Sequence, residues 1–331
     1  MPRTPARLAL IGAGAIADEH CAAIGETADL ELVRVVDRHA ERAQALAARY
    51  GTGHSGEPAS LYHQDVDAVI VCTSPDSHVS LATAALTAGK AVLLEKPAAL
   101  ELASVDELLA VASRTRAPLL VGQTARFQPA HLELAAALAD GQVGTPRLIH
   151  VSWYAGHVWP GGWRGWQLDP LRSGGHVLHN GVHALDLVTW LMDDTPARVF
   201  ARPLRTWTGE MPTPDSFHII IEFTGGGQAV VELSYGLTRR GSLLRRVLIA
   251  GTDGTACVST DDEPSADTAP PLPPAGVAGA MLRQYAHFRD VLISGAAPLT
   301  SPAQIRGALV AAIAAERSSR TRRVVEAGAL R

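Results

Sequence analysis

A glycine-rich stretch near the N-terminus has the residue types of a dinucleotide site. Residues 11–17 read IGAGAIA and lie where an apolar run gives way to an alanine-rich segment. Gly12 permits a tight turn, and Gly14 lets the backbone come close to a pyrophosphate. The amides of Ala15 and Ile16 would open a helix whose positive end attracts phosphate. By itself the motif is weak, since a solvated glycine-rich turn has the same letters.

An aspartate at the correct distance strengthens this interpretation. Asp37 ends the next apolar run about twenty residues further on, where a carboxylate accepts the ribose hydroxyls. Its charge also repels a 2′-phosphate, so NAD is the predicted cofactor. Arg38 follows directly and keeps NADP as the alternative, because an arginine there can bind a phosphate. It can also stack on adenine or stay solvated.

The first third of the chain alternates apolar runs with helical segments. Continuous apolar strands separated by helices of about ten residues predict βαβ units and a parallel sheet covered on both faces. Residues 1–122 are therefore predicted to form a Rossmann domain, a doubly wound α/β sheet. The expected strands are Leu8–Ile11, Leu30–Val36, Ala68–Cys72, Ala91–Leu94 and Pro118–Val121, and the expected helices are Ala15–Glu26, Ala40–Tyr50, Val79–Ala88 and Ser104–Thr115.

The pattern changes after Gly122 to longer alternating segments that are typical of a half-covered sheet. Residues 123–331 are predicted to form an α+β domain for substrate binding and oligomerisation. Its sheet should be open, largely antiparallel or mixed, with helices on one face. The expected strands are Pro146–Tyr154, Arg198–Pro203, Phe217–Phe223, Gln228–Tyr235 and Leu243–Ala250, and the expected helices are Ala130–Ala139, His176–Met192, Met281–Ser294 and Pro302–Arg317.

Composition narrows the class of protein. The 29 basic and 33 acidic residues leave a formal charge of −4, which gives no reason to expect nucleic acid or an anionic membrane as partner. The three cysteines lie far apart and suit a reducing compartment more than a zinc site. No signal peptide or membrane span is visible, so a cytoplasmic protein is expected. The extended second sheet favours a homodimer or homotetramer.

Four ordered motifs lie beyond the dinucleotide turn. They read TSPDSH at 73–78, EKP at 95–97, GQTARFQP at 122–129 and SGGHVLHNGVHALD at 173–186. Together they resemble the glucose-fructose oxidoreductase / inositol dehydrogenase / MocA family, and the resemblance spans nearly the whole chain. It implies an NAD(P)-dependent dehydrogenase or ketoreductase that acts on a secondary alcohol of a sugar, sugar derivative or cyclitol.

The resemblance also implies roles for individual residues. Lys96 would be catalytic, polarising the reacting oxygen and stabilising its alkoxide character. His183 would be the general acid and base, because an imidazole titrates near neutral pH. The remaining cofactor contacts would come from Thr73, Ser74, Pro75, His78, Glu95, Lys96 and Gln123, and the substrate contacts from Lys96, Arg126, Trp166, His179 and His183.

One departure from the family pattern lies in the fourth motif. His179 stands where the family usually has aspartate, one helical turn before His183. It could assist proton transfer, bind substrate, or mark a changed substrate or a lost activity. His176 and Asp186 extend the same helical stripe, and such ligands can hold zinc or manganese. No metal is predicted, because the family chemistry needs none.

A tryptophan-rich loop precedes that motif, and tryptophan faces suit the C–H surfaces of sugars. Two pairs fit the Trp-Arg position of the family, Trp163-Arg164 by residue type and Trp166-Gln167 by spacing.

Two other functions stay open: a redox-neutral reaction with retained NAD, and a non-catalytic NAD-binding sensor.

Overall fold

A computed structural model describes residues 4–62, 65–156, 166–206, 211–238, 241–259 and 277–330. By its contacts the chain forms two compact units, which are described separately. The first comprises Met1–Ala99, Ala103–Phe127 and Ala278–Pro302, and the second comprises Leu100–Leu102, Gln128–Val277 and Ala303–Arg331.

The first unit contains a six-stranded parallel sheet in the order β3-β2-β1-β4-β5-β6. The central strands are apolar along their whole length because helices cover both faces, which confirms the predicted Rossmann sheet. Only β3 escaped prediction, since it is a three-residue strand with mostly exposed side chains. The strands are β1 (Ala6–Ile11), β2 (Leu30–Val36), β3 (Gly53–Ser55), β4 (Ala68–Val71), β5 (Ala91–Leu94) and β6 (Leu119–Val121).

The predicted helices between these strands are present: α2 agrees to the residue, and the ends of the others differ by at most two residues. Helix α1 begins two residues later than expected, because Ala15 and Ile16 form a turn before it. The helices are α1 (Ala17–Glu26), α2 (Ala40–Tyr50), α3 (His78–Thr87) and α4 (Leu102–Thr115).

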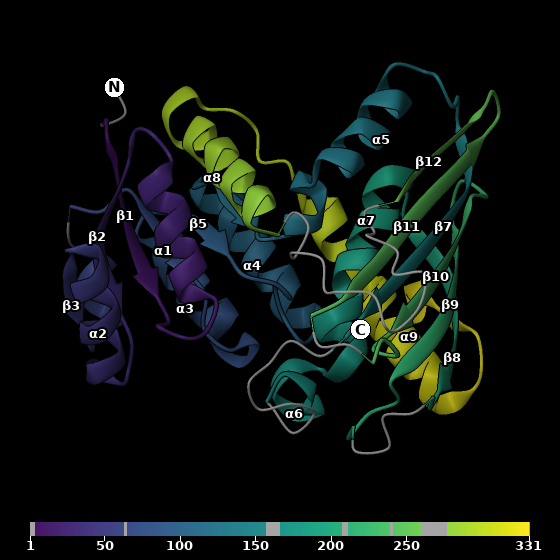
Figure 1. The fold of residues 1–331 in the computed structure, drawn as a ribbon, viewed down its shortest axis with the longest axis horizontal. Helices are drawn as coiled ribbons and strands as arrows, with labels where there is room; N and C mark the ends of the chain where they lie inside the picture. The colour runs from purple at the N-terminus through teal and green to yellow at the C-terminus, as the bar shows by residue number, and fades with distance from the viewer. Residues whose placement is uncertain are drawn as a thin grey trace. The chain divides into compact units, whose positions relative to one another are not determined.

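A helix from late in the sequence completes the first unit. Helix α8 (Val277–Ser294) lies close to α1 in this unit (Figure 1). Met281, Tyr285 and Phe288 form one stripe on α8 that shares an apolar core with β1 and α1. Their spacing of four and three residues places them on a single helical face. The domain boundary after residue 122 stays a prediction; the contacts add that α8 belongs with the first unit.

The second unit contains a seven-stranded sheet in the order β12-β11-β7-β10-β9-β8-β13. Its pairs are antiparallel except for β7 with β10, so the predicted mixed sheet is confirmed. The strands are β7 (Pro146–Ala155), β8 (Pro196–Leu204), β9 (Ser216–Phe223), β10 (Gln228–Ser234), β11 (Leu243–Gly251), β12 (Thr255–Ser259) and β13 (Val325–Glu326). The sequence did not predict β12 or β13.

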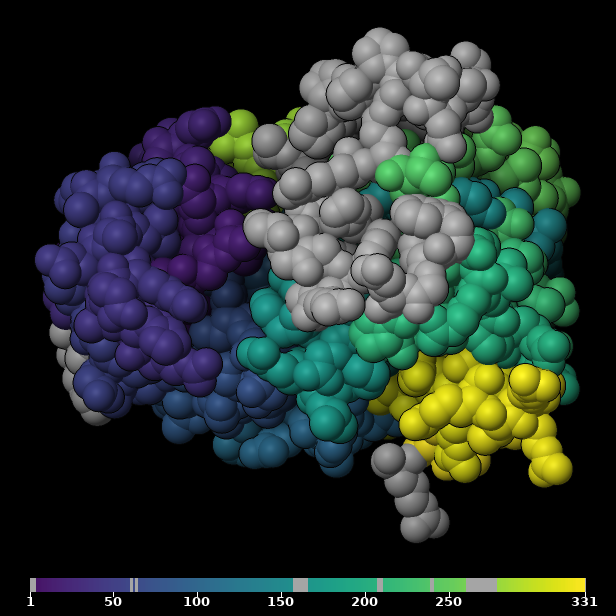
Figure 2. Space-filling model, turned by 60° about the horizontal axis from the view of Figure 1, so that its bottom comes forward, coloured from purple at the N-terminus to yellow at the C-terminus, as the bar shows by residue number. Residues whose placement is uncertain are grey.

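Helices α5 (Pro129–Ala139), α6 (Pro170–Ser173), α7 (Val182–Met192) and α9 (Pro302–Thr321) accompany this sheet. The expected continuous α-helix from His176 is wrong in its first part, since residues 177–181 form a π-helical turn before α7. Helix α9 is fastened to β8 through Ser318, whose hydroxyl accepts from Ala201 N and donates to Arg323 O. Figure 2 shows its yellow surface continuing the teal and green of this unit.

A search of the helices in the described ranges finds no segment that is long and apolar enough to span a bilayer.

Candidate active site

The dinucleotide turn lies where β1 and β4 diverge. Gly12 has φ +107°, and a Cβ there would lie 2.7 Å from Cys72 O, so the backbone of β4 excludes any side chain. The Cys72 thiol donates to Gly12 O at 3.0 Å and ties the two strand ends together. Between β1 and β4 the strand order reverses, and ligands bind at such a switch point, outside the carboxyl ends of the strands.

The space beyond the turn fits a dinucleotide. Gly14 and Ala15 are exposed, and a Cβ on Gly14 would meet no atom within 4 Å. Helix α1 follows at once, and the apolar side chain of Ile16 before it cannot cap its free amides. A phosphate group can therefore approach the helix end closely.

Asp37 is held in place at the end of β2. Its Oδ2 accepts Ala13 N at 2.7 Å and its Oδ1 accepts His39 N at 2.8 Å. Each carboxylate oxygen keeps a further lone pair for a ribose hydroxyl. Arg38 beside it is exposed. The residues present thus fit the NAD that the sequence predicts.

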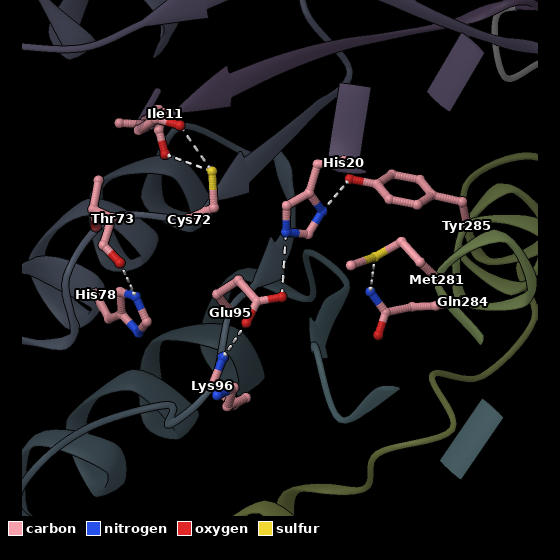
Figure 3. A network of polar contacts seen from close by, with 11 residues as sticks. Ile11, His20, Cys72, Thr73, His78, Glu95, Lys96, Met281, Gln284 and Tyr285 are labelled. Atoms are coloured by element: carbon pink, nitrogen blue, oxygen red, sulfur yellow. Dashed lines mark hydrogen bonds and ion pairs between the residues drawn. The ribbon is translucent and has the colours of Figure 1, made fainter. Parts of the chain in front are cut away.

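Two buried side chains, Glu95 and His78, contact the Lys96–Pro97 segment. Glu95 Oε2 accepts Lys96 N at 3.1 Å. His78 Nδ1 lies 2.8 Å from Pro97 O. Its Nε2 lies 3.1 Å from Thr73 O (Figure 3). Burial lowers the pKa of His78, which favours a neutral ring. A neutral ring donates to one of these two carbonyl oxygens only. Glu95 therefore holds Lys96 N and His78 packs between Pro97 and the loop after β4, while the contact of both side chains with the cofactor stays a prediction.

The loop after β4 is ordered by its own hydroxyl groups. Ser77 Oγ donates to Thr73 Oγ1 at 2.8 Å and to Ser74 O at 2.9 Å. Pro75 is buried and begins a short 3₁₀ turn. Thr73 and Ser74 are half-buried at this loop, so their polar groups remain partly accessible for the predicted cofactor contacts.

Two predicted residues follow β6 and are buried within the first unit. Gln123 Oε1 has no hydrogen-bond partner among the residues that the structure describes, so it is an acceptor that a ligand could satisfy. Arg126 donates to Leu299 O at 2.9 Å and fastens the segment after α8. Its predicted contact with substrate remains untested.

In the second unit His183 faces a tryptophan. The rings of His183 and Trp153 are stacked at 6.1 Å with an angle of 28°. Trp153 Nε1 donates to Asn180 Oδ1 at 3.3 Å, and the Arg245 guanidinium lies 3.9 Å from the Trp153 ring centre. Burial lowers the pKa of Arg245 to about 10, so the group remains a cation at neutral pH. The sequence did not predict Asn180 or Arg245.

A second histidine–tryptophan pair also has an arginine beside its indole ring, but its rings meet at a steep angle. The Trp166 ring meets His179 edge to face at 5.7 Å, and Arg172 lies 5.8 Å from the Trp166 ring centre. The structure thus brings Trp166 and His179 together, and both were predicted to contact substrate. Trp163 and Arg164 lie outside the described residues, so the choice between the two tryptophan pairs stays open.

His176 is part of the core. Its ring stacks on Tyr235 at 4.0 Å, Nδ1 lies 3.3 Å from Pro214 O, and Nε2 accepts from Asn180. Burial lowers the pKa of His176 to about 3, so the ring is neutral at physiological pH. Asp186 is also fully buried. No three His, Cys, Asp or Glu side chains in the described ranges are grouped to hold a metal ion.

Comparison with known proteins gives two family matches. The model described as "Oxidoreductase family, NAD-binding Rossmann fold" matches residues 6–123, and the model described as "GFO/IDH/MocA C-terminal domain" matches residues 131–257. Both matches agree with the motifs that carried the resemblance.

Individual relatives extend this similarity. The chain is 31% identical over 242 residues to an inositol 2-dehydrogenase of Rhizobium meliloti, which covers 71% of each protein. It is 28% identical to a D-apiose dehydrogenase of Paraburkholderia graminis, covering 96% of this chain and 88% of that protein. The fold matches GenD2 of gentamicin A biosynthesis, solved with NAD, at a TM-score of 0.84, 21% identity and coverage of 98% and 97%. The chain therefore belongs to the GFO/IDH/MocA family of NAD-binding oxidoreductases.

Proposed function

We propose that this oxidoreductase interconverts a secondary alcohol and a ketone on a sugar, sugar derivative or cyclitol. The observation that carries the proposal is the fixed Lys96–Pro97 segment: Glu95 accepts Lys96 N, and His78 lies between Pro97 O and Thr73 O of the loop after β4. Relatives named for inositol and apiose support this substrate class. The tryptophans beside His179 and His183 also support it, because indole faces pack against sugar C–H groups.

Gly12, Gly14 and Asp37 would hold NAD, whose nicotinamide accepts or supplies the hydride when it is bound. The Lys96 ammonium would donate a hydrogen bond to the reacting oxygen and stabilise its developing negative charge. His183 would take the hydroxyl proton during oxidation and return it during reduction. His179 would bind a neighbouring hydroxyl or pass the proton onward.

We further propose that the second sheet forms a homodimer or homotetramer interface. Ile220 and Leu148 are large apolar residues that are about 40% exposed on its strands. An isologous contact across this sheet would bury both. Light scattering of the wild type and Ile220→Asp tests it: a monomeric wild type would contradict the proposal.

The activity test uses purified protein with NAD or NADP and a panel of polyols, sugars and their ketones, followed by absorbance at 340 nm. We expect turnover that Lys96→Ala and His183→Ala each reduce by about 100-fold or more, as for general acid–base groups. NAD binding, measured by fluorescence, should survive in both variants. A folded, NAD-binding wild type without any nicotinamide redox change would contradict the proposal and favour a sensor.

A further inference from the structure

Three polar side chains from distant parts of the sequence meet inside the first unit. His20 lies on α1, Glu95 follows β5, and Tyr285 lies on α8 (Figure 3). His20 and Tyr285 are completely buried and Glu95 is 8% exposed. Burying polar groups is unfavourable unless they satisfy one another, so their meeting needs a structural or functional reason.

The direction of the hydrogen bonds follows from the protonation of Tyr285. Its hydroxyl lies 2.8 Å from His20 Nδ1, and burial raises the pKa of Tyr285 well above its ordinary value. The phenol is therefore protonated and donates to Nδ1. The imidazole proton then resides on Nε2. That atom lies 3.2 Å from Glu95 Oε1, close enough for electrostatic attraction but outside the geometry of a hydrogen bond.

Glu95 also contacts Lys96. Its other oxygen, Oε2, accepts Lys96 N at 3.1 Å. Gly122 leaves room for the carboxylate, since a Cβ there would come within 3.0 Å of Oε1. A continuous chain of polar contacts thus runs from α8, through α1, to the Lys96 peptide.

The carboxylate is charged despite its burial. Burial raises the pKa of Glu95, but the contacts with His20 and Lys96 outweigh it, so the net shift is downward. The other titratable groups that interact with Glu95 are Glu19, Cys72, His78 and Tyr285. By reciprocity, a negative Glu95 stabilises the protonated form of Lys96.

We propose that Tyr285, His20 and Glu95 form a positioning relay for Lys96. Glu95 fixes the lysine peptide and supplies the counter-charge that keeps the ammonium protonated. Tyr285 acts through His20 and fixes which way the carboxylate faces. The inference rests on the proposed function, because it assigns this support to the lysine that would stabilise the reacting oxygen.

The first test measures the pKa of Lys96 without any turnover. Competitive labelling of the lysines with acetic anhydride across pH, read by mass spectrometry, reports each Nζ separately. Glu95→Gln keeps an acceptor for Lys96 N but removes the charge, so the pKa of Lys96 should fall by about one unit. Tyr285→Phe removes a single oxygen and should give a smaller fall in the same direction.

The matched control is Phe288→Leu, which changes another fully buried ring on α8. It should lower the melting temperature and leave the pKa of Lys96 unchanged. His20→Gln, which keeps a donor that can reach Glu95, should retain more of the wild-type pKa than His20→Ala. If Glu95→Gln does not fold, the pKa of Lys96 is compared instead among Tyr285→Phe, His20→Gln and His20→Ala.

The second test uses turnover. In Glu95→Gln, kcat should fall tenfold or more. In Tyr285→Phe, which leaves every predicted cofactor contact in place, kcat should fall less and KM for NAD should change less than threefold. The alkaline limb of the kcat profile should move to lower pH by the same amount as the pKa of Lys96. Unchanged labelling and pH profiles in both variants, with only a lower melting temperature, would overturn the relay. A shifted pKa in a protein without redox activity would overturn the proposed function alone.

Discussion

The same added methyl group should have opposite consequences at Gly12 and Gly14. At Gly12, φ is +107° and the new Cβ would lie 2.7 Å from Cys72 O and 3.0 Å from Thr73 N. Those are backbone atoms that cannot rotate away. At Gly14 the backbone is not in a left-handed conformation, and a Cβ would meet nothing within 4 Å.

The expected size of each effect follows from these contacts. A non-glycine residue held at positive φ costs about 1–2 kcal/mol. Pushing the end of β4 aside adds about 1–3 kcal/mol, as for other overpacked sites. Gly12→Ala should therefore lower the free energy of unfolding by about 2–5 kcal/mol. Gly14→Ala should change it by no more than about 0.5 kcal/mol, as for an exposed position.

Binding of NAD should separate the two variants further. The methyl group on Gly14 occupies the space through which the pyrophosphate would pass, so Kd for NAD should rise about tenfold or more, or about 1.4 kcal/mol. Urea unfolding followed by circular dichroism gives stability, and a fluorescence titration gives Kd. A Gly14→Ala variant that binds NAD as the wild type does would refute this path for the cofactor. A Gly12→Ala variant as stable as the wild type would refute the close approach to Cys72.

Three further variants test other parts of the site. Asp37→Ser removes the charge that opposes a 2′-phosphate, so NADP should gain on NAD by about tenfold or more in kcat/KM, with Arg38 available to bind the phosphate. Arg245→Met removes the cation over Trp153, so it should lower the free energy of unfolding by about 1 kcal/mol and lower kcat/KM for the polyol. The control is Arg246→Met at the exposed neighbouring position, which should change neither quantity. In the wild type, the unfolded chain protonates His176 near pH 6.5 and the folded chain only near pH 3. As the pH is lowered between these values, the free energy of unfolding should therefore decrease by about 1.4 kcal/mol per pH unit. His176→Phe should remove this contribution; an unchanged slope of unfolding free energy against pH would contradict it.

The parts of the fold that the sequence predicts are those governed by short-range patterns. Buried parallel strands such as Ala91–Leu94 are apolar throughout, and the ends of Leu30–Val36 and Ala40–Tyr50 agree with the structure to the residue. Short exposed strands such as β12 carry no such pattern. The π-helical turn at 177–181 also escaped prediction, because its apolar and polar residues fit an α-helix equally well.

The residues of the candidate site also differ in whether a local sequence pattern predicts them. Gly12, Gly14 and Asp37 act through the local backbone, so their spacing alone indicates a nucleotide turn. Lys96 and His183 came from the family resemblance, because a lone lysine or histidine has no spacing to interpret.

The supporting residues depend on pairings that no local pattern encodes. Arg245 lies opposite Trp153 across β11 and β7, on the same strand face as the buried Val247. A charged residue at an inward position of a strand is the one signal that could have drawn attention to it. Tyr285 meets His20 across 265 positions of sequence, and its stripe on α8 looks like ordinary core spacing. The reacting groups of such a site are therefore easier to find from sequence than the groups that set their charge, since the former are tied to motifs and the latter to the tertiary fold.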